Sequence, residues 1–359
     1  MMRKAAMVIA IGSVVVSACG GGGGGTTTAS TNPTSTSVGT STTTTGGSSS
    51  SSTTTTTPSS NSGSLPSTGL AASYAKTVWF DNFSQDPSGP PNTSLWAMET
   101  GNGAEYGNPG WGNNEAEYYL PSNAAVENGD LVITGKADNS QTGYSFTSAK
   151  VTSLKPIDLS QPGFLEVKAQ LPTGTGSWPA IWLLPGESPG QNFPPTSAQL
   201  ATQPTWPAGG EIDMVEWLSR YFGTQNSVIQ STFHLPSGAS SPAYTDAYQY
   251  VKATLSTPID TSFHLYQLAW TATQIQFAVD NTVLTTCSKS TLVCTPTDPN
   301  SPALPPSAFW PYGGIYQTYY LIMNLAVGGN LGAPSGSNAN LPANYSQAMD
   351  VAYVRYMTP

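Results

Sequence analysis

The stretch Gly163-Phe164-Leu165-Glu166-Val167-Lys168-Ala169-Gln170-Leu171 decides the fold class. Apolar and polar residues alternate along most of it, and successive side chains of a β-strand point to opposite faces. The alternation therefore predicts a strand that turns one face toward a core. A second stretch, 277–284 (FAVDNTVL), predicts a hairpin that turns at Asp280-Asn281.

Ten short segments in all are rich in Val, Ile, Tyr, Phe and Trp and are bounded by clusters of Gly, Pro, Asn and Ser, which is the pattern of strands. They are 77–83, 131–136, 163–171, 178–184, 211–217, 228–234, 263–270, 274–280, 319–327 and 349–356. No helical pattern separates them. The sequence therefore predicts an all-β fold, a β-sandwich or jelly roll of two antiparallel sheets.

The composition narrows the range of possible functions. The chain has 359 residues with 36 Gly and 30 Pro, which disfavours an all-helical protein. Its formal net charge is -9 and only 9% of its residues are charged, so phosphate backbones would repel it and nucleic acid is excluded as a partner. Aromatic residues (9 Trp, 17 Tyr and 10 Phe) are plentiful and favour a neutral, ring-shaped ligand.

The N-terminus has the features of a bacterial export signal. Residues 1–19 begin with two basic residues and continue with an apolar run at 5–16, which is too short to span a bilayer comfortably. The segment 16–19 (VSAC) resembles the lipobox of bacterial lipoproteins. We therefore predict a lipid on Cys19 that holds an exported protein to a membrane, and an ordinary cleaved signal peptide is the alternative.

Residues 20–70 are almost entirely Gly, Ser and Thr, and no charged residue occurs between Lys4 and Lys76. Such a segment cannot bury enough apolar surface to offset its ordering entropy, so it predicts a disordered linker. Residues 71–359 contain no second linker and are predicted to form one domain. A monomer is the simplest expectation.

The cysteines and histidines argue against a metal cluster. With Cys19 assigned to the lipid, Cys287 and Cys294 are predicted to form a disulfide, as expected of an exported protein. The two histidines, His234 and His264, lie thirty residues apart, and no Cys-x-x-Cys occurs. No metal centre is predicted from these residues.

The segment 209–217 (GGEIDMVEW) carries three carboxylates. On a strand, Glu211 and Asp213 share one face. Strict alternation would place Glu216 in the core, but the consecutive apolar residues Met214 and Val215 predict a β-bulge that returns Glu216 to the acidic face.

The spacing of these carboxylates suggests a chemistry. Glu211 and Glu216 would stand about four strand steps apart, which brings leaning carboxyl groups to about 5–6 Å. A retaining glycosidase uses a separation of about 5–5.5 Å. Asp213 between them adds negative charge, which raises the proton affinity of its neighbours. A solvated strand face and a calcium site are the alternative interpretations.

The acidic strand resembles the signature of family-16 glycoside hydrolases, in the bulged form of laminarinase-like endo-β-1,3-glucanases. The similarity extends through most of residues 77–356. The motifs that carry it are WFDNF (79–83), GNNEAEYY (112–119), NGDLVIT (128–134), SWPAIWLLP (177–185) and LIMNLAVGG (321–329).

The resemblance implies a β-jelly roll with a substrate cleft on its concave sheet. It implies that Glu211 is the nucleophile, Glu216 the acid/base and Asp213 their electrostatic partner, in a retaining endo-hydrolase of β-glucan, most simply β-1,3-glucan such as laminarin. No organic cofactor is implied. Hydrolysis of mixed-linkage β-1,3-1,4-glucan, a bacterial exopolysaccharide or a galactan is the alternative, as is a non-catalytic carbohydrate-binding domain.

The resemblance also places further residues near the cleft. We expect His234 to hydrogen-bond to the carboxylate group, whereas His264 is expected to be structural. Sugar rings stack on flat aromatic side chains. The expected platforms are Trp178 and Trp206, followed by Trp182 and Trp111, and the expected hydroxyl binders are Asn114 and Glu115.

Two positions depart from the family pattern. Lys150 stands where relatives usually have an arginine that reaches the sugar, and a lysine offers a point charge in place of a planar fork. In the last strand, Ala352 stands where relatives often have a calcium-binding aspartate, and Asp350 lies two residues earlier. A structural calcium ion is therefore an open expectation.

Overall fold

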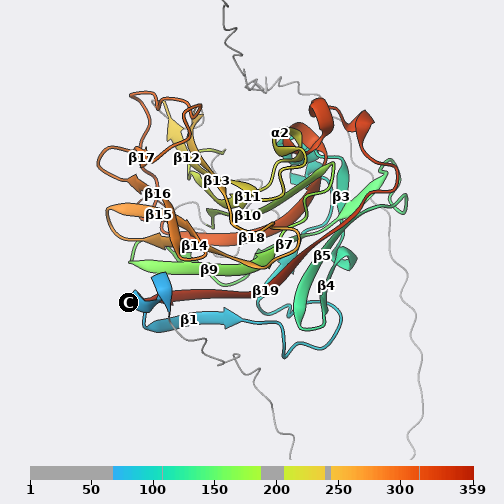
Figure 1. The fold of residues 1–359 in the computed structure, drawn as a ribbon, viewed down its shortest axis with the longest axis horizontal. Helices are drawn as coiled ribbons and strands as arrows, with labels where there is room; N and C mark the ends of the chain where they lie inside the picture. The colour runs from blue at the N-terminus through green and yellow to red at the C-terminus, as the bar shows by residue number, and fades with distance from the viewer. Residues whose placement is uncertain (1–67, 107, 187–205, 239–243, 315) are drawn as a thin grey trace, which may run out of the picture. The chain divides into compact units, whose positions relative to one another are not determined.

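Two β-sheets carry nearly all of the regular structure (Figure 1). The computed structural model describes residues 68–106, 108–186, 206–238, 244–314 and 316–359. The predicted signal peptide, Cys19 and all but the last residues of the predicted linker lie outside the described residues. Each of the ten predicted segments forms a strand, so the all-β fold is confirmed.

The first sheet has eleven strands. In spatial order they are β17 (Cys294–Thr295), β16 (Thr282–Ser288), β15 (Gln274–Val279), β14 (His264–Trp270), β9 (Gly163–Gln170), β19 (Ser346–Thr358), β5 (Asp130–Ala137), β6 (Phe146–Ser148) and β3 (Glu117–Tyr119); in addition β1 (Lys76–Asp81) pairs with β19 and β4 (Ala124–Glu127) pairs with β5.

The second sheet has eight strands and holds the acidic segment. Its order is β13 (Thr245–Thr254), β12 (Val228–Ser237), β11 (Glu211–Glu216), β10 (Ser177–Pro185), β18 (Thr318–Val327), β7 (Lys150–Ser153) and β2 (Trp96–Met98), and β8 (Ile157–Asp158) pairs with β18. All strand pairs of both sheets are antiparallel except β3 with β6, which is parallel. The predicted pairing therefore holds with this one exception.

Helical structure in the described ranges is confined to segments of three to five residues. The α-helices are α2 (Ser219–Phe222) and α3 (Gly329–Gly332), and the 3-10 turns are η1 (Gly69–Ser73), η2 (Ala104–Tyr106), η3 (Pro109–Gly112), η4 (Pro121–Asn123), η5 (Pro334–Gly336) and η6 (Asn338–Asn340). No helix within these ranges has the length and apolar character needed to cross a membrane.

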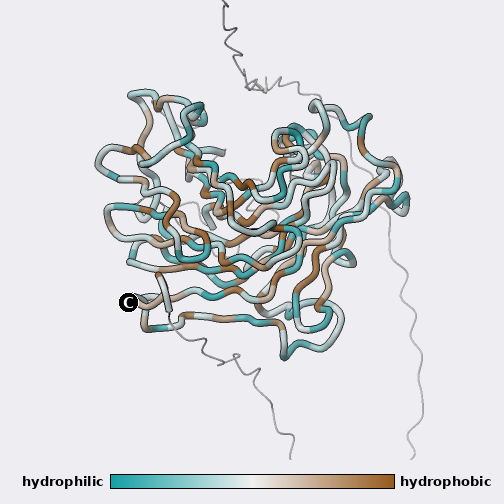
Figure 2. Tube along the Cα trace, viewed as in Figure 1, coloured by the Kyte–Doolittle hydropathy of each residue, from teal (hydrophilic) through white to brown (hydrophobic). Residues whose placement is uncertain are grey.

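The core lies between the two sheets. Leu165 of β9 and Phe277 of β15 face it from the eleven-stranded sheet, and Ile212 of β11 and Phe233 of β12 face it from the eight-stranded sheet. The rings of Phe233 and Phe277 meet with centroids 6.3 Å apart. Along the strands hydrophobic residues recur between hydrophilic ones (Figure 2). Burial of this apolar face leaves the other face of the eight-stranded sheet free to carry polar side chains.

The predicted hairpin and disulfide are both present. Asp280 and Asn281 connect β15 to β16 and have φ angles of 49° and 66°. Positive φ at both central residues is what a tight two-residue hairpin turn requires, and Asp and Asn tolerate it well. Cys287 and Cys294 are bonded and link β16 to β17 at the edge of the eleven-stranded sheet.

Candidate active site

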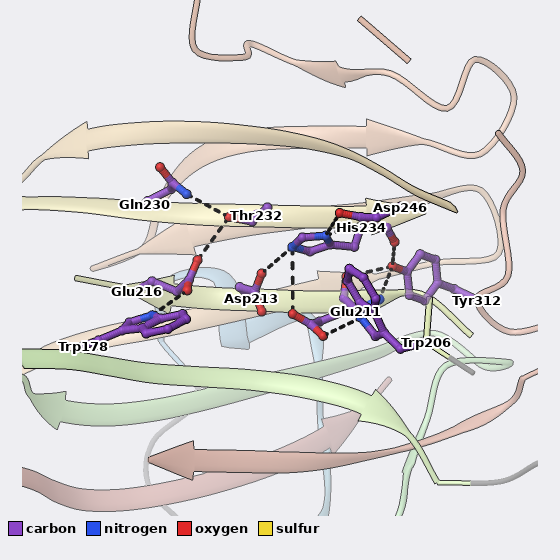
Figure 3. A network of polar contacts seen from close by, with 10 residues as sticks. All are labelled: Trp178, Trp206, Glu211, Asp213, Glu216, Gln230, Thr232, His234, Asp246 and Tyr312. Atoms are coloured by element: carbon purple, nitrogen blue, oxygen red, sulfur yellow. Dashed lines mark hydrogen bonds and ion pairs between the residues drawn. The ribbon is translucent and has the colours of Figure 1, made fainter. Parts of the chain in front are cut away.

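The bulge predicted in the acidic strand is present in β11. Against β12, the pairing runs from Asp213 opposite Thr232 directly to Glu216 opposite Gln230, and the register shifts between them. Met214 and Val215 lie in the interrupted stretch and are both buried in the core. The two apolar side chains therefore absorb the extra residue, and Glu216 returns to the face that carries Asp213 (Figure 3).

Glu216 is held by two donors from neighbouring strands. The indole Nε1 of Trp178 on β10 donates to its Oε1 over 2.9 Å. The hydroxyl of Thr232 on β12 donates to its Oε2 over 3.3 Å, and Gln230 in turn donates to that hydroxyl over 3.2 Å. Only 7% of Glu216 is exposed. Its carboxyl group is thus fixed in orientation by side chains on both sides of β11.

Glu211 lies at the start of β11 and has a different set of partners. The indole Nε1 of Trp206 donates to its Oε2 over 2.9 Å. The Tyr312 hydroxyl accepts the backbone N–H of Glu211 over 3.1 Å and contacts the carbonyl oxygens of Glu211 and His234. The Glu211 side chain keeps 17% of its surface exposed. Tyr312 therefore ties β11 to β12 while the carboxyl group stays reachable.

His234 joins the carboxylates into one group. It pairs with Glu211 across the β11–β12 ladder, and its Nε2 lies 3.1 Å from Asp213 Oδ2 and 3.9 Å from Glu211 Oε1. Its Nδ1 lies 3.0 Å from both carboxylate oxygens of Asp246 on β13. The predicted contact between His234 and the carboxylate group is confirmed. Asp246 is the partner that sequence reasoning missed.

These contacts shift the proton affinities of the group. Burial and the charge of Asp213 raise the pKa of Glu216 to about 8, with the Trp178 N–H opposing. The same two causes raise the pKa of Glu211 well above its usual range, and His234 opposes them. Burial lowers the pKa of His234, but Asp246 and Asp213 outweigh it and raise that pKa well above the usual value.

The group has one feature of a metal site. Glu211, Asp213 and His234 each offer an atom within 4.8 Å of the others, and no other such set of three occurs in the described part of the chain. Coordination, however, needs a neutral imidazole nitrogen. Because carboxylates flank both nitrogens of His234, they favour the imidazolium, which has no lone pair for a metal. The arrangement fits proton sharing better than metal binding.

A second polar network lies on the other side of β10. The Trp182 indole donates to Asn324 on β18 over 2.8 Å, Asn324 donates to the Tyr119 hydroxyl over 3.0 Å, and that hydroxyl donates to Glu115 over 3.2 Å. Burial and the neighbouring Glu117 raise the pKa of Glu115 well above its usual range. This network connects β10, β18 and β3.

Lys150 on β7 belongs to the same region. Its Nζ lies 4.0 Å from the centroid of the Trp111 ring, 5.5 Å from that of Trp182 and 3.5 Å from Glu99 Oε2. Glu99 also accepts a hydrogen bond from Thr152 over 3.1 Å. Lys150 is only 7% exposed. The lysine is therefore already engaged by an acid and two indole rings, which the sequence did not reveal.

The tryptophans divide into two kinds. Trp206 is 51% exposed, so its ring is accessible for stacking as predicted. Trp178 is 7% exposed and shares the face of Glu216, to which its indole N–H donates, so stacking of its ring on a sugar stays a prediction. Trp111 and Trp182 are partly buried.

Asn114 and His264 were also named from the sequence, and they lie in different parts of the structure. Asn114 is exposed and its carbonyl accepts a hydrogen bond from Asn338 over 2.7 Å. His264 is on β14 in the other sheet, where its Nδ1 lies 2.6 Å from Asp280. That position agrees with the structural part expected of His264.

Several side chains of the site were not identified from the sequence: Thr232, Gln230, Asp246, Tyr312, Asn324, Tyr119 and Glu99. Asn324 and Tyr119 stand within quoted motifs, which offered a signal. Asp246 precedes the alternating stretch 247–252 (AYQYVK), whose strand character would have placed it beside β12. Tyr312 and Glu99 lie in segments without periodicity and gave none.

Comparison with known proteins gives consistent matches. Residues 121–314 match the sequence profile of glycosyl hydrolases family 16. The chain is 30% identical to a beta-glucanase of Rhodothermus marinus, over 79% of this chain and 85% of that protein. It is 29% identical to a glucan endo-1,3-beta-glucosidase of Cryptopygus antarcticus, over 75% and 88%. The laminarinase catalytic domain of Thermotoga maritima superimposes with a TM-score of 0.59 at 28% identity, over 79% of this chain and 98% of that one.

Proposed function

The chain belongs to glycosyl hydrolase family 16, and from this membership and the site we infer a retaining endo-hydrolase of β-glucan whose preferred substrate is β-1,3-glucan. One observation carries the assignment to particular residues. A single bulged strand presents Glu211 and Glu216 on one face with Asp213 between them, and His234 on β12 lies opposite Glu211 and contacts Asp213. We propose Glu211 as the nucleophile and Glu216 as the acid/base.

The first half of the reaction breaks the glycosidic bond. The Glu211 carboxylate attacks the anomeric carbon and forms a bond to it, while the bond to the leaving oxygen breaks. Glu216 transfers its proton to that oxygen, so the leaving chain departs as a neutral alcohol. The pKa of about 8 keeps Glu216 protonated near neutral pH, as an acid catalyst requires.

The second half releases the sugar. A water molecule gives a proton to the now ionised Glu216 and attacks the anomeric carbon, and the bond to Glu211 breaks. Two inversions at one carbon leave its configuration unchanged. Attack requires the ionised form of Glu211. Burial and Asp213 raise the pKa of Glu211, and protonated His234 and the Trp206 N–H oppose that rise by stabilising the charged carboxylate.

The roles of the two glutamates can be separated by azide rescue. In Glu211→Ala, azide can occupy the space of the missing carboxylate and displace the leaving group once, so an activated β-glucoside should give the α-glucosyl azide. In Glu216→Ala, azide replaces water on the glycosyl-enzyme, so the product should be the β-azide. Opposite anomers in a proton NMR spectrum would reverse the assignment, and no rescue by either variant would reject it.

The polymer itself is chosen by contacts outside the carboxylate group. Mixed-linkage β-1,3-1,4-glucan, a bacterial exopolysaccharide and a galactan remain alternatives, because Lys150 replaces the arginine expected beside the sugar. A panel of purified polysaccharides with reducing-sugar detection decides among them. Binding to a glycan without release of product would instead support a carbohydrate-binding module.

We also propose that the protein is exported and held to the bacterial cell envelope by a lipid on Cys19. The basic start, the short apolar run and the lipobox-like segment 16–19 support this, and the linker at 20–70 would let the domain search a polymer. Cys19→Ser should release the protein from the membrane fraction. Continued sedimentation with membranes would refute the anchor.

A structural calcium ion stays a proposal. Asp350 on β19 is the candidate ligand; its pKa is raised mainly by burial and also by the charges of Asp130 and Glu127, although the three carboxylates do not gather within 4.8 Å of one another. Hard carboxylate oxygens suit Ca²⁺. If the ion binds there, a chelator should lower the thermal midpoint and added Ca²⁺ should restore it. The mechanism above does not involve this ion.

A further inference from the structure

The edge strand of the eight-stranded sheet carries two tyrosines beside the carboxylate group. In the β12–β13 ladder, Tyr248 lies opposite His234 and Tyr250 lies opposite Thr232. Residues directly opposite in an antiparallel pair project to the same face. Because His234 contacts Glu211 and Asp213, both tyrosines share the face of the carboxylates, one strand beyond β12.

The rings of these tyrosines lie side by side and nearly parallel. The centroids of Tyr248 and Tyr250 lie 6.5 Å apart with 20° between the planes, and Tyr248 lies 5.6 Å from the His234 ring. The intervening Gln249 is buried on the opposite face, as strand alternation requires. Lys252 places its Nζ 5.1 Å from the Tyr250 ring centroid.

These distances define how a ligand could bind. A ring inserted between the two tyrosines would need about 3.5–4 Å on each side, more than the gap offers. A ligand would therefore lie across the ring edges and the hydroxyl groups. Among the described residues neither hydroxyl hydrogen-bonds to the protein, and burial raises the pKa of both phenols, so they stay neutral donors. Neutral hydroxyls and apolar ring edges match a pyranose.

We propose that Tyr248 and Tyr250 form a sugar-binding subsite on the β13 side of the carboxylates. The inference rests on the proposed glycan hydrolase function. β13 lies two strand spacings from β11, about 10 Å, so the subsite holds a sugar unit beyond those that contact Glu211 and Glu216. The substrate chain then crosses the strands, with Trp182 and Lys150 on the other side of β11.

The test measures how the rate depends on chain length. The wild-type protein, the double variant Tyr248→Ala/Tyr250→Ala and the double variant with Phe are assayed on a graded series of oligosaccharides from the polymer that the wild type cleaves. The loss in kcat/KM of the alanine variant should grow with length and reach about tenfold on the longest substrates, mainly through KM. The phenylalanine variant, which keeps the ring edges, should lose less.

Tyr74→Ala is the matched control, because it removes a partly buried tyrosine that stacks on Phe164 of the other sheet. It should leave the length dependence unchanged. An equal loss on every length, or no loss on any, would overturn the subsite. If the wild type cleaves no polysaccharide, the proposed function fails separately. Retardation of wild type and alanine variant in polysaccharide-containing native gels then tests the subsite, and equal retardation, or none, rejects it.

Discussion

Replacing Asp246 by Asn tests the electrostatics of the site directly. Asn keeps the shape of the side chain and removes its charge, while Asp213 still contacts the other nitrogen of His234. The contact that loses its charge is 3.0 Å long, and the side chains are 16% and 20% exposed. A hydrogen bond between charged groups contributes about 1.5–3 kcal/mol. Since one pH unit corresponds to about 1.36 kcal/mol, the pKa of His234 should fall by about one to two pH units.

The assay is a pH titration of ¹⁵N-histidine-labelled protein by NMR. The chain has two histidines, so each signal can be assigned, and His264 on the other sheet is an internal reference. In the wild type both nitrogens of His234 should stay protonated above pH 7. A neutral His234 at pH 7 in the wild type, or the same pKa in both proteins, would refute the electrostatic reasoning.

The same substitution has a second readout in stability. A histidine whose pKa is raised in the folded state stabilises the fold fully at pH values below its unfolded pKa, and this contribution is lost as the pH rises through the folded pKa. Asp246→Asn should therefore lower the free energy of unfolding by about 1.5–3 kcal/mol at pH 5. The difference from the wild type should shrink at high pH. Urea unfolding at a series of pH values measures it.

Three further predictions concern other groups. Glu216→Gln should raise the free energy of unfolding at pH 8 by about 1–3 kcal/mol and leave it nearly unchanged at pH 4. The reason is that a carboxyl group whose pKa is raised by folding lowers stability only as the pH rises above its pKa in the unfolded chain. Equal effects at both pH values in urea unfolding would contradict this. Trp178→Phe removes a donor to Glu216 and should move the alkaline limb of kcat/KM to higher pH, whereas Trp182→Phe should not; a common displacement would argue against the Trp178 contact. Replacing Cys287 and Cys294 by Ser should cost about 2 kcal/mol in denaturant unfolding, from the short closed loop, without loss of activity; lost activity in the folded variant would count against a purely structural disulfide.

The strands were predictable because their signal is local. Alternation in 163–171 and the turn residues Asp280-Asn281 act over a few neighbouring positions, and the structure places β9 and the β15–β16 hairpin there. The strand β13 was not predicted. One of its core-facing residues is Gln249, a polar residue that interrupts the hydrophobic pattern expected of a strand. Gln249 is nevertheless buried, and its side chain accepts a hydrogen bond from the backbone N–H of Cys294 over 2.8 Å.

The acidic face was also readable from the sequence. Two consecutive apolar residues, Met214 and Val215, cannot alternate, and burying both required the bulge that brings Glu216 back beside Asp213. That inference needed only the side-chain period of a strand and the tendency of apolar groups to leave water.

The partners of that face were decided by the tertiary structure. Trp178 was expected to stack on a sugar; it lies on the same face of the sheet as Glu216, is only 7% exposed, and points its N–H toward that carboxyl group. Asp246 reaches His234 only because β12 and β13 pair in one particular register. The periodicity of a segment specifies which side chains share a face, but the side chain that lies opposite depends on strand order and register, which form between residues distant in the sequence.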